Sequence, residues 1–178
     1  MITSSEGGSR KSQSLSLREI AICALLISLV AITTLIVRIP TPVTGGYVNL
    51  GDVIIIAGSF LLGSTRGFLI GGLGSAVADI IGGHVWFAPG TLLIKGLEGF
   101  LSGLLGKDLN NNSRPAFRAL GGLAGAVVMV AGYFIYELFL RGFAVALTAI
   151  IPNTLQGLTG VCGAFMIYPL LAKARRNM

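Results

Sequence analysis

Residues 18–37 read REIAICALLISLVAITTLIV, an apolar run that is uninterrupted once its first two charged residues have passed. A helix needs about 20 predominantly apolar residues to cross the hydrocarbon core of a bilayer, and this run is long enough. A cleaved signal peptide has a shorter apolar core of roughly 7–15 residues, and no small-residue cleavage motif precedes Arg38. The run therefore predicts a retained transmembrane helix.

The composition of the whole chain also indicates a membrane protein. Of its 178 residues, 53% are hydrophobic and 11% are charged, and the mean hydropathy is +0.84. A soluble domain carries about 25% charged residues, because its surface faces water. Most of the surface of this chain must therefore face lipid or other apolar protein. The 26 glycines lie within apolar stretches, where small residues let membrane helices approach closely.

Five further apolar runs follow the first, and segments rich in proline, glycine or polar residues separate them. RIPTPVTGGYVNLGD at 38–52 contains helix-breaking prolines and glycines, and KDLNNNSRPAFR at 107–118 is the most polar internal segment. The run at 50–64 is short for a full crossing, and a re-entrant segment would show the same pattern. The predicted further spans are residues 50–64, 67–83, 89–106, 118–138 and 149–172.

These runs predict an all-α integral membrane protein with six transmembrane helices in one membrane domain, residues 17–172. We expect the polar, Ser-rich residues 1–16 to form a disordered cytoplasmic tail, and residues 173–178 to form a basic cytoplasmic tail.

The distribution of Lys and Arg predicts the orientation, because positive residues concentrate on the cytoplasmic side of a membrane. Only Arg38 and Arg141 fall on the side opposite the N-terminus, and Lys95 lies within a span. Both termini are therefore predicted to be cytoplasmic. The N-terminal side carries Arg10, Lys11, Arg18, Arg66, Lys107, Arg114, Arg118, Lys173, Arg175 and Arg176.

Polar side chains inside the predicted spans gather in the half of the membrane that faces outside. A charged residue within the bilayer costs at least ~2.5 kcal/mol, so each one needs a partner or a function. Together with aromatic residues of the loops, these side chains suggest a polar cavity for a small flat ligand, which would stack on rings and form hydrogen bonds. The candidate binding residues are Tyr47, Asn49, Asp79, His84, Trp86, Phe87, Lys95, Glu98, Tyr133, Tyr136, Glu137, Asn153 and Gln156.

Simpler structural roles for the same residues remain open. Lys95 and Glu98 are spaced i, i+3 and could pair on one helix face. Asp79 could cap a helix or pair with Lys95, and Asp52 and Asn153 stand where helix N-caps are expected. The loop aromatics could form an interfacial belt, and the single histidine could be solvated.

The sequence lacks the common motifs of nucleotide binding, hydrolysis and metal binding. It contains no G-x-x-x-x-G-K-[S/T], H-E-x-x-H, C-x-x-C or G-x-S-x-G pattern. Cys23 and Cys162 lie in separate apolar segments, which indicates neither a disulfide framework nor a metal site. The net charge of +6 comes from residues at the ends of spans and not from a basic groove, so we expect no nucleic-acid partner. We expect no enzymatic activity.

A stripe of small residues on the first span predicts a contact with another helix. Ala21, Ala24, Ser28 and Ala31 share one helical face, where a second helix could pack closely, either within this protein or from a partner. The glycine pairs Gly67/Gly71, Gly99/Gly103 and Gly121/Gly125 are expected to make internal contacts.

Two adjacent stretches resemble a known transporter family. GYVNLGDVIIIAGSFLLGSTRGFLIGGLGSAVADIIGG at 46–83, followed by APGTLLIKGLEGFLSGLLG at 88–106, resembles the substrate-binding (S) components of energy-coupling factor (ECF) vitamin transporters, in particular those for riboflavin, pyridoxine or hydroxymethylpyrimidine. The resemblance covers about residues 17–172. It implies six helices, cytoplasmic termini, a multi-pass location in the bacterial plasma membrane, and an outward-facing vitamin site closed by the first loop.

The resemblance also implies partners. The S components contact a transmembrane coupling (T) subunit through an Ala-x-x-x-Ala motif on the first helix, whose nearest match here is Ala24-x-x-x-Ser28. Two separate ATPase subunits use ATP, so this chain itself needs no cofactor. Pyridoxine or hydroxymethylpyrimidine is the first expected substrate and riboflavin the next. The rival functions are an ion-coupled carrier that acts alone, a small membrane enzyme, and an assembly subunit without a ligand.

Overall fold

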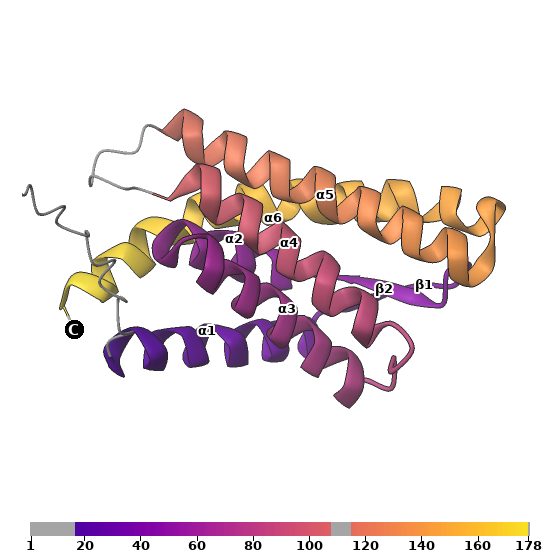
Figure 1. The fold of residues 1–178 in the computed structure, drawn as a ribbon, viewed down its shortest axis with the longest axis horizontal. Coiled ribbons are helices and arrows are strands. Elements are labelled where there is room, and N and C mark those ends of the chain that lie inside the picture. The colour runs from indigo at the N-terminus through magenta and orange to yellow at the C-terminus, as the bar shows by residue number, and fades with distance from the viewer. Residues whose placement is uncertain (1–16, 108–114, 178) are drawn as a thin grey trace, which may run out of the picture.

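The computed structural model describes residues 17–107 and 115–177 as a bundle of helices with one small hairpin (Figure 1). The all-α class is confirmed, and the hairpin is an addition that the sequence did not predict. The tail predicted at 1–16 lies outside the described residues. The elements are α1 (Leu17–Ile36), β1 (Arg38–Thr41), β2 (Gly46–Asn49), α2 (Gly51–Leu62), α3 (Ser64–Ile81), α4 (Ala88–Gly106), α5 (Pro115–Arg141) and α6 (Phe143–Asn177).

The hairpin occupies most of the segment that we predicted only as a break between helices. Its strands are antiparallel, with Arg38 opposite Asn49 and Thr41 opposite Gly46. Gly45 has φ +64° in the turn, and its N–H donates to the carbonyl of Thr41. Glycine adopts this left-handed conformation without a steric penalty, so the chain can reverse here within four residues.

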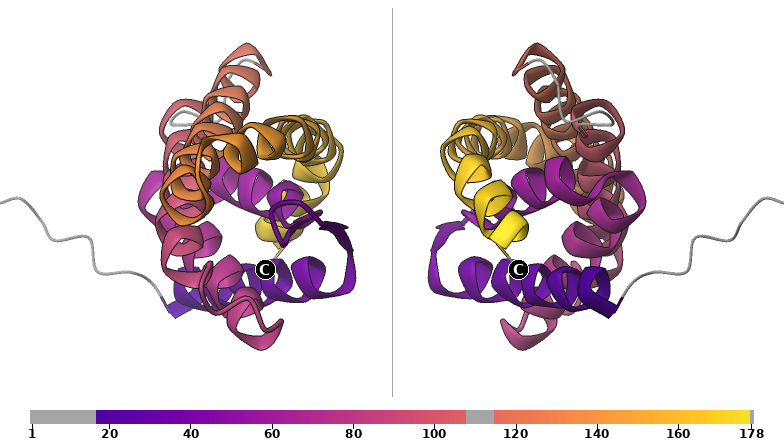
Figure 2. Two further views of the ribbon diagram at one scale, coloured as in Figure 1. Left: turned by 90° about the vertical axis from the view of Figure 1, so that its right-hand side faces the viewer. Right: turned by 90° about the vertical axis from the view of Figure 1, so that its left-hand side faces the viewer.

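α2 is short for a membrane crossing. Twelve residues rise about 18 Å, well under the roughly 30 Å of hydrocarbon that a crossing requires. Of the second predicted span, 50–64, α2 covers residues 51–62, and Asp52 at its start is fully buried inside the bundle. Apart from Asp52 and Ser59, α2 is apolar, and it packs against α1, α3, α4 and α6 in the interior of the bundle, which Figure 2 shows from its two ends.

The last two helices are longer than predicted. We expected spans at 118–138 and 149–172, but α5 and α6 run over Pro115–Arg141 and Phe143–Asn177 with only Gly142 between them. Gly142 has φ +88°, which permits this sharp reversal. Pro152 lies inside α6, nine residues after the helix begins at Phe143. The helix also continues through residues 173–177, which we had assigned to a tail.

Within residues 17–107 and 115–177, three helices, α1, α5 and α6, are long and apolar enough to cross a membrane by length and composition. α3 and α4 have 18 and 19 residues and are rich in glycine, which brings them into close contact. A Cβ atom on Gly67 would overlap the carbonyl of Gly99, and one on Gly71 would overlap the carbonyl of Lys95. These glycines therefore make the internal contacts that we predicted for them.

Basic residues gather at one end of the bundle. Arg66 forms a 2.8 Å ion pair with Glu19, and Arg175 donates to the carbonyl of Leu61. The starts of α1 and α3 and the ends of α2 and α6 therefore meet at this end, the left side of Figure 1. The hairpin and the α3–α4 and α5–α6 turns lie at the other end, with Arg38 and Arg141. This segregation agrees with the predicted topology, although which end is cytoplasmic stays a prediction.

Candidate binding site and family

A cavity of about 40 Å³ lies beneath the hairpin, at the end of the bundle with few basic residues. Every helix except α2 contributes to its wall, together with the hairpin and the α3–α4 turn. The volume holds only a few water molecules, so a ring-sized ligand enters only if the hairpin or the wall side chains move. The lining residues are Thr34, Thr41, Thr44, Gly46, Tyr47, Asn49, Ser75, Asp79, His84, Phe87, Thr91, Lys95, Tyr133, Glu137, Ala149, Pro152, Asn153 and Gln156.

Most of the candidate binding residues line this cavity, but three do not. Trp86 is 86% exposed at the surface of the α3–α4 turn, away from the cavity. The hydroxyl of Tyr136 donates to the main-chain oxygen of Trp86 at 2.6 Å, and its ring lies 6.1 Å from that of Phe87. Glu98 is buried beneath the cavity. The predicted residues that line it are Tyr47, Asn49, Asp79, His84, Phe87, Lys95, Tyr133, Glu137, Asn153 and Gln156.

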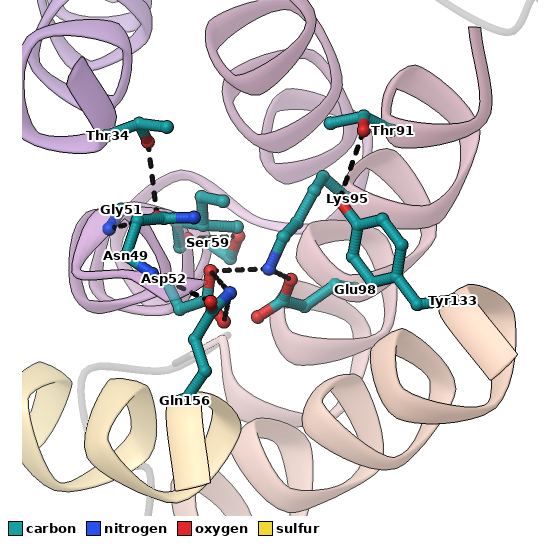
Figure 3. A network of polar contacts seen from close by, with 11 residues as sticks. Thr34, Asn49, Gly51, Asp52, Ser59, Thr91, Lys95, Glu98, Tyr133 and Gln156 are labelled. Carbon is teal, nitrogen blue, oxygen red and sulfur yellow. Dashed lines mark hydrogen bonds and ion pairs between the residues drawn. The ribbon is translucent and has the colours of Figure 1, made fainter. Parts of the chain in front are cut away.

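The floor of the cavity is an ion cluster of Asp52, Lys95 and Glu98. Lys95 Nζ lies 2.5 Å from Asp52 Oδ1 and 2.8 Å from Glu98 Oε2, and all three side chains are at most 2% exposed (Figure 3). Close approach of α3 and α4 at Gly71 positions the turn of α4 that carries Lys95. The pairing of Lys95 with Glu98 that their i, i+3 spacing suggested is therefore confirmed, and Asp52 is a second partner.

The structure contradicts three of the simpler roles suggested by the sequence, including that of Asn153, which lies inside α6 and does not cap it. Asp52 does not cap α2, because Leu50 is the N-cap residue and the Asn49 side chain accepts a 2.7 Å hydrogen bond from the N–H of Gly51. Asp79 does not form an ion pair with Lys95; within the described residues, the carboxylate partners of Lys95 are those on α2 and α4.

Gln156 on α6 connects the ion cluster to the hairpin. Its Nε2 donates to both carboxylate oxygens of Asp52, at 3.2 and 3.0 Å, and its Oε1 accepts from the N–H of Asn49 at 2.8 Å (Figure 3). One Lys balances two carboxylates here, and two of its three N–H donors are engaged. The cluster thus joins α2, α4, α6 and the hairpin in the interior.

Tyr47 and Arg38 hold the hairpin against α3. The hydroxyl of Tyr47 donates to Asp79 Oδ1 at 2.6 Å, and its ring meets that of His84 edge to face at 4.8 Å. Burial, together with the neighbouring Asp79 carboxylate, raises the pKa of the Tyr47 phenol, so it remains a donor. The Arg38 guanidinium lies 4.8 Å from the Tyr47 ring and donates to the carbonyls of Ala78 and Gly82.

Several buried polar atoms of the cavity wall make no hydrogen bond within residues 17–107 and 115–177. They are Asp79 Oδ2, Glu137 Oε2 and His84 Nδ1. Glu137 Oε2 has only a distant ion-pair partner, Arg141 Nε at 3.6 Å. Unpaired buried acceptors cost free energy, so the two carboxylate oxygens favour a ligand that brings hydrogen-bond donors. No group of His, Cys, Asp and Glu suited to a metal ion occurs in the described part of the chain.

Sequence reasoning missed part of the wall. Ser75 precedes Asp79 by four residues and Thr91 precedes Lys95 by four, so helical spacing could have identified both. Asp52 was recognised as polar but not included in the site. The hairpin threonines gave no signal, because the hairpin itself was not predicted. The wall residues that were missed are Thr34, Thr41, Thr44, Gly46, Ser75, Thr91, Ala149 and Pro152.

The stripe of small residues on α1 divides between two environments. Ala21, Ala24 and Ser28 are exposed, whereas Ala31 is buried within the bundle and is not available to a partner. The Ser28 hydroxyl donates to the carbonyl of Ala24 at 3.0 Å, which satisfies this polar group without a partner helix.

Comparison with known proteins identifies the family. The family described as "ECF-type riboflavin transporter, S component" matches residues 14–173. A protein of Pyrococcus woesei described as "Uncharacterized protein in gap 3'region" is 39% identical over 132 residues, which cover 74% of this chain and 86% of that protein. The thiamine precursor transporter HmpT of Lactococcus lactis subsp. cremoris is 26% identical over 159 residues, covering 89% and 90% of the two chains.

These matches confirm the resemblance that we drew from residues 46–106. The family is one of transporter components and not of enzymes, and its members are multi-pass proteins of the plasma membrane. Because the match spans nearly the whole chain, this protein belongs to the S-component family of ECF-type riboflavin transporters.

Proposed function

We propose that this S component captures a small water-soluble vitamin or vitamin precursor from outside the cell, in the cavity beneath the hairpin. The observation that supports this most strongly is the position of the cavity. It lies at the end of the bundle opposite the basic residues, and positive residues mark the cytoplasmic side. Its wall combines aromatic rings with buried polar groups, as in sites for flat heteroaromatic ligands.

The size of the cavity favours a ligand with one ring. About 40 Å³ is available, so every ligand requires some opening, and a three-ring flavin requires much more than a single pyrimidine or pyridine. The relative HmpT is described as a transporter of a thiamine precursor, which agrees with this preference. Hydroxymethylpyrimidine or pyridoxine is therefore our first candidate, and riboflavin, which gives the family its name, is the next.

Delivery into the cell is proposed to require partners. A T subunit would dock on the exposed face of α1 that carries Ala21, Ala24 and Ser28, because small side chains permit close approach of a second helix. Two ATPase subunits would supply ATP hydrolysis. The chain itself would bind the vitamin and use no cofactor.

The direct test is a titration of the purified full-length protein with hydroxymethylpyrimidine, pyridoxine and riboflavin, together with native mass spectrometry of the freshly purified protein. We expect submicromolar binding of one of the three, or a co-purified molecule of that class. Absence of binding to all three, with no co-purified small molecule, would contradict the proposal.

Uptake measurements separate the proposed function from its rivals. Cells that express the chain with T and ATPase subunits should accumulate the vitamin, and cells that express the chain alone should not. Uptake that persists without the ATPase subunits would instead indicate an ion-coupled carrier. Chemical conversion of a lipid or isoprenoid substrate by the isolated chain would indicate a membrane enzyme.

A further inference from the structure

The carboxylate of Asp79 is only half satisfied. Its Oδ1 accepts the 2.6 Å hydrogen bond from Tyr47, whereas its Oδ2 has no hydrogen-bond partner among the described residues. The residue is 3% exposed and lines the cavity, so water outside the protein does not compensate the unpaired oxygen. Thr91 is the nearest further donor: its hydroxyl accepts a hydrogen bond from Tyr133 and interacts with the carboxylate of Asp79, but it forms no hydrogen bond of normal geometry to Oδ2. An unpaired charged acceptor of this kind is stabilised by a ligand that donates to it.

The charges around the cavity favour the same kind of ligand. The ammonium of Lys95 is already shared by Asp52 and Glu98, so it offers no free positive charge to an anion. Asp79 and Glu137 add two more carboxylates to the wall, and of these only Glu137 has an ion-pair partner within the ranges that the structure describes, Arg141 at 3.6 Å. Arg38 directs its N–H groups to main-chain carbonyls and not into the cavity. An anionic ligand would therefore meet an excess of negative charge in a low-dielectric interior.

An amino group on a heteroaromatic ring matches these demands. Conjugation with the ring gives the group two N–H donors and almost no acceptor strength, whereas a hydroxyl brings an acceptor along with its donor. The ring itself can pack against the aromatic wall formed by Tyr47, Phe87 and Tyr133. A ring that is protonated beside its amino group would gain further from the carboxylates.

We propose that Asp79 determines the specificity of the site: its Oδ2 accepts a hydrogen bond from an amino group on a neutral or cationic heteroaromatic ring, and phosphorylated forms of that ring are rejected. This inference rests on the proposed function, because it takes the cavity to be the vitamin site. Tyr47 keeps Asp79 in place through Oδ1, which leaves Oδ2 for the ligand.

The test compares three probes by calorimetry on the full-length protein: amino(hydroxymethyl)pyrimidine, the analogue with a carbonyl in place of its amino group, and the phosphate ester of the amino compound. We expect the wild-type protein to prefer the amino compound over both others by roughly 10- to 100-fold, the effect of one charge-assisted hydrogen bond. This comparison needs no variant.

The Asp79→Asn variant replaces the hydrogen-bond acceptor Oδ2 with a hydrogen-bond donor. The amide oxygen can still accept from Tyr47, while an NH₂ donor replaces Oδ2, so the carbonyl analogue should now bind at least as tightly as the amino compound. Glu19→Gln is the matched control, because it makes a carboxylate-to-amide change at the opposite end of the bundle. It should keep the wild-type preference.

The outcomes separate this inference from the proposed function. Three results would overturn the role of Asp79. They are equal wild-type affinity for the amino and carbonyl probes, tighter binding of the phosphate ester than of the amino compound, and an equal loss of affinity for the amino and carbonyl probes in Asp79→Asn. Binding of riboflavin or pyridoxine without the amino probe would also overturn it, yet leave the vitamin-binding function intact. Failure to bind any vitamin would overturn both.

Discussion

The ion cluster beneath the cavity yields the most quantitative prediction, for the substitution Lys95→Met. The Lys95 ammonium contacts the carboxylates of Asp52 and Glu98 at 2.5 and 2.8 Å, and all three side chains are at most 2% exposed. Methionine keeps the length and packing of the side chain but leaves two neighbouring carboxylates without a positive charge. Breaking a buried pair in this way costs about 3–5 kcal/mol.

The assay is the free energy of unfolding in mixed detergent micelles, followed by circular dichroism across a denaturant titration. Arg66→Met is the control, because it breaks a more exposed ion pair whose side chains are 20% and 27% exposed, and it should cost about 1 kcal/mol or less. The triple variant Asp52→Asn/Lys95→Met/Glu98→Gln removes all three charges together and should recover most of the loss. If Lys95→Met and Arg66→Met lose the same stability, the buried cluster does not have the role that we assign to it.

Three further predictions concern helix packing, the hairpin and partner docking. Gly99→Ala should destabilise the bundle several-fold more than Gly58→Ala. The new methyl group at Gly99 meets the backbone of α3, whereas that at Gly58 meets the ends of the Leu26 and Ile70 side chains at 3.2 and 3.4 Å; equal unfolding free energies would contradict this. Arg38→Gln should speed vitamin release by roughly tenfold in a stopped-flow measurement, because it removes the hydrogen bonds from the hairpin to main-chain carbonyls near the ends of α1 and α3. An unchanged release rate would count against the hairpin as a lid. Ala24→Trp should abolish ATP-dependent uptake but keep vitamin binding. Leu29→Trp, an exposed position about 140° around α1 from Ala24, should retain both; loss of uptake in both variants would exclude a specific docking face.

The sequence predicted the class and the general position of the site because both depend on simple physical costs. A scarcity of charge forces most of the surface into lipid, and a charge within the bilayer needs a partner. Lys95 and Glu98 were identified for that reason, and the structure places them together. Positive residues at the ends of spans likewise predicted two chemically different ends of the bundle, as the contacts of Arg66 and Arg175 show.

The features that the sequence did not predict depend on tertiary contacts, which local sequence patterns do not indicate. Residues 38–49 form a hairpin because α1, α3 and α6 provide partners for Arg38, Tyr47 and Asn49, while the sequence showed only proline and glycine. Asn153 was expected at a helix N-cap, but α6 begins at Phe143 and continues through Pro152. Trp86 was expected in the wall because aromatic residues suit flat ligands, yet a loop residue can point either way.

The proposed function depends on the cavity opening to the outside of the cell, and the labelling of single cysteines in intact cells tests this most directly. In a background with Cys23→Ala and Cys162→Ala, Val43→Cys places an exposed thiol on the hairpin, and Ala116→Cys places one at the start of α5. A membrane-impermeant maleimide should label Val43→Cys in intact cells and Ala116→Cys only after the membrane is opened. The reverse pattern would place the cavity on the cytoplasmic side and contradict capture of a vitamin from outside.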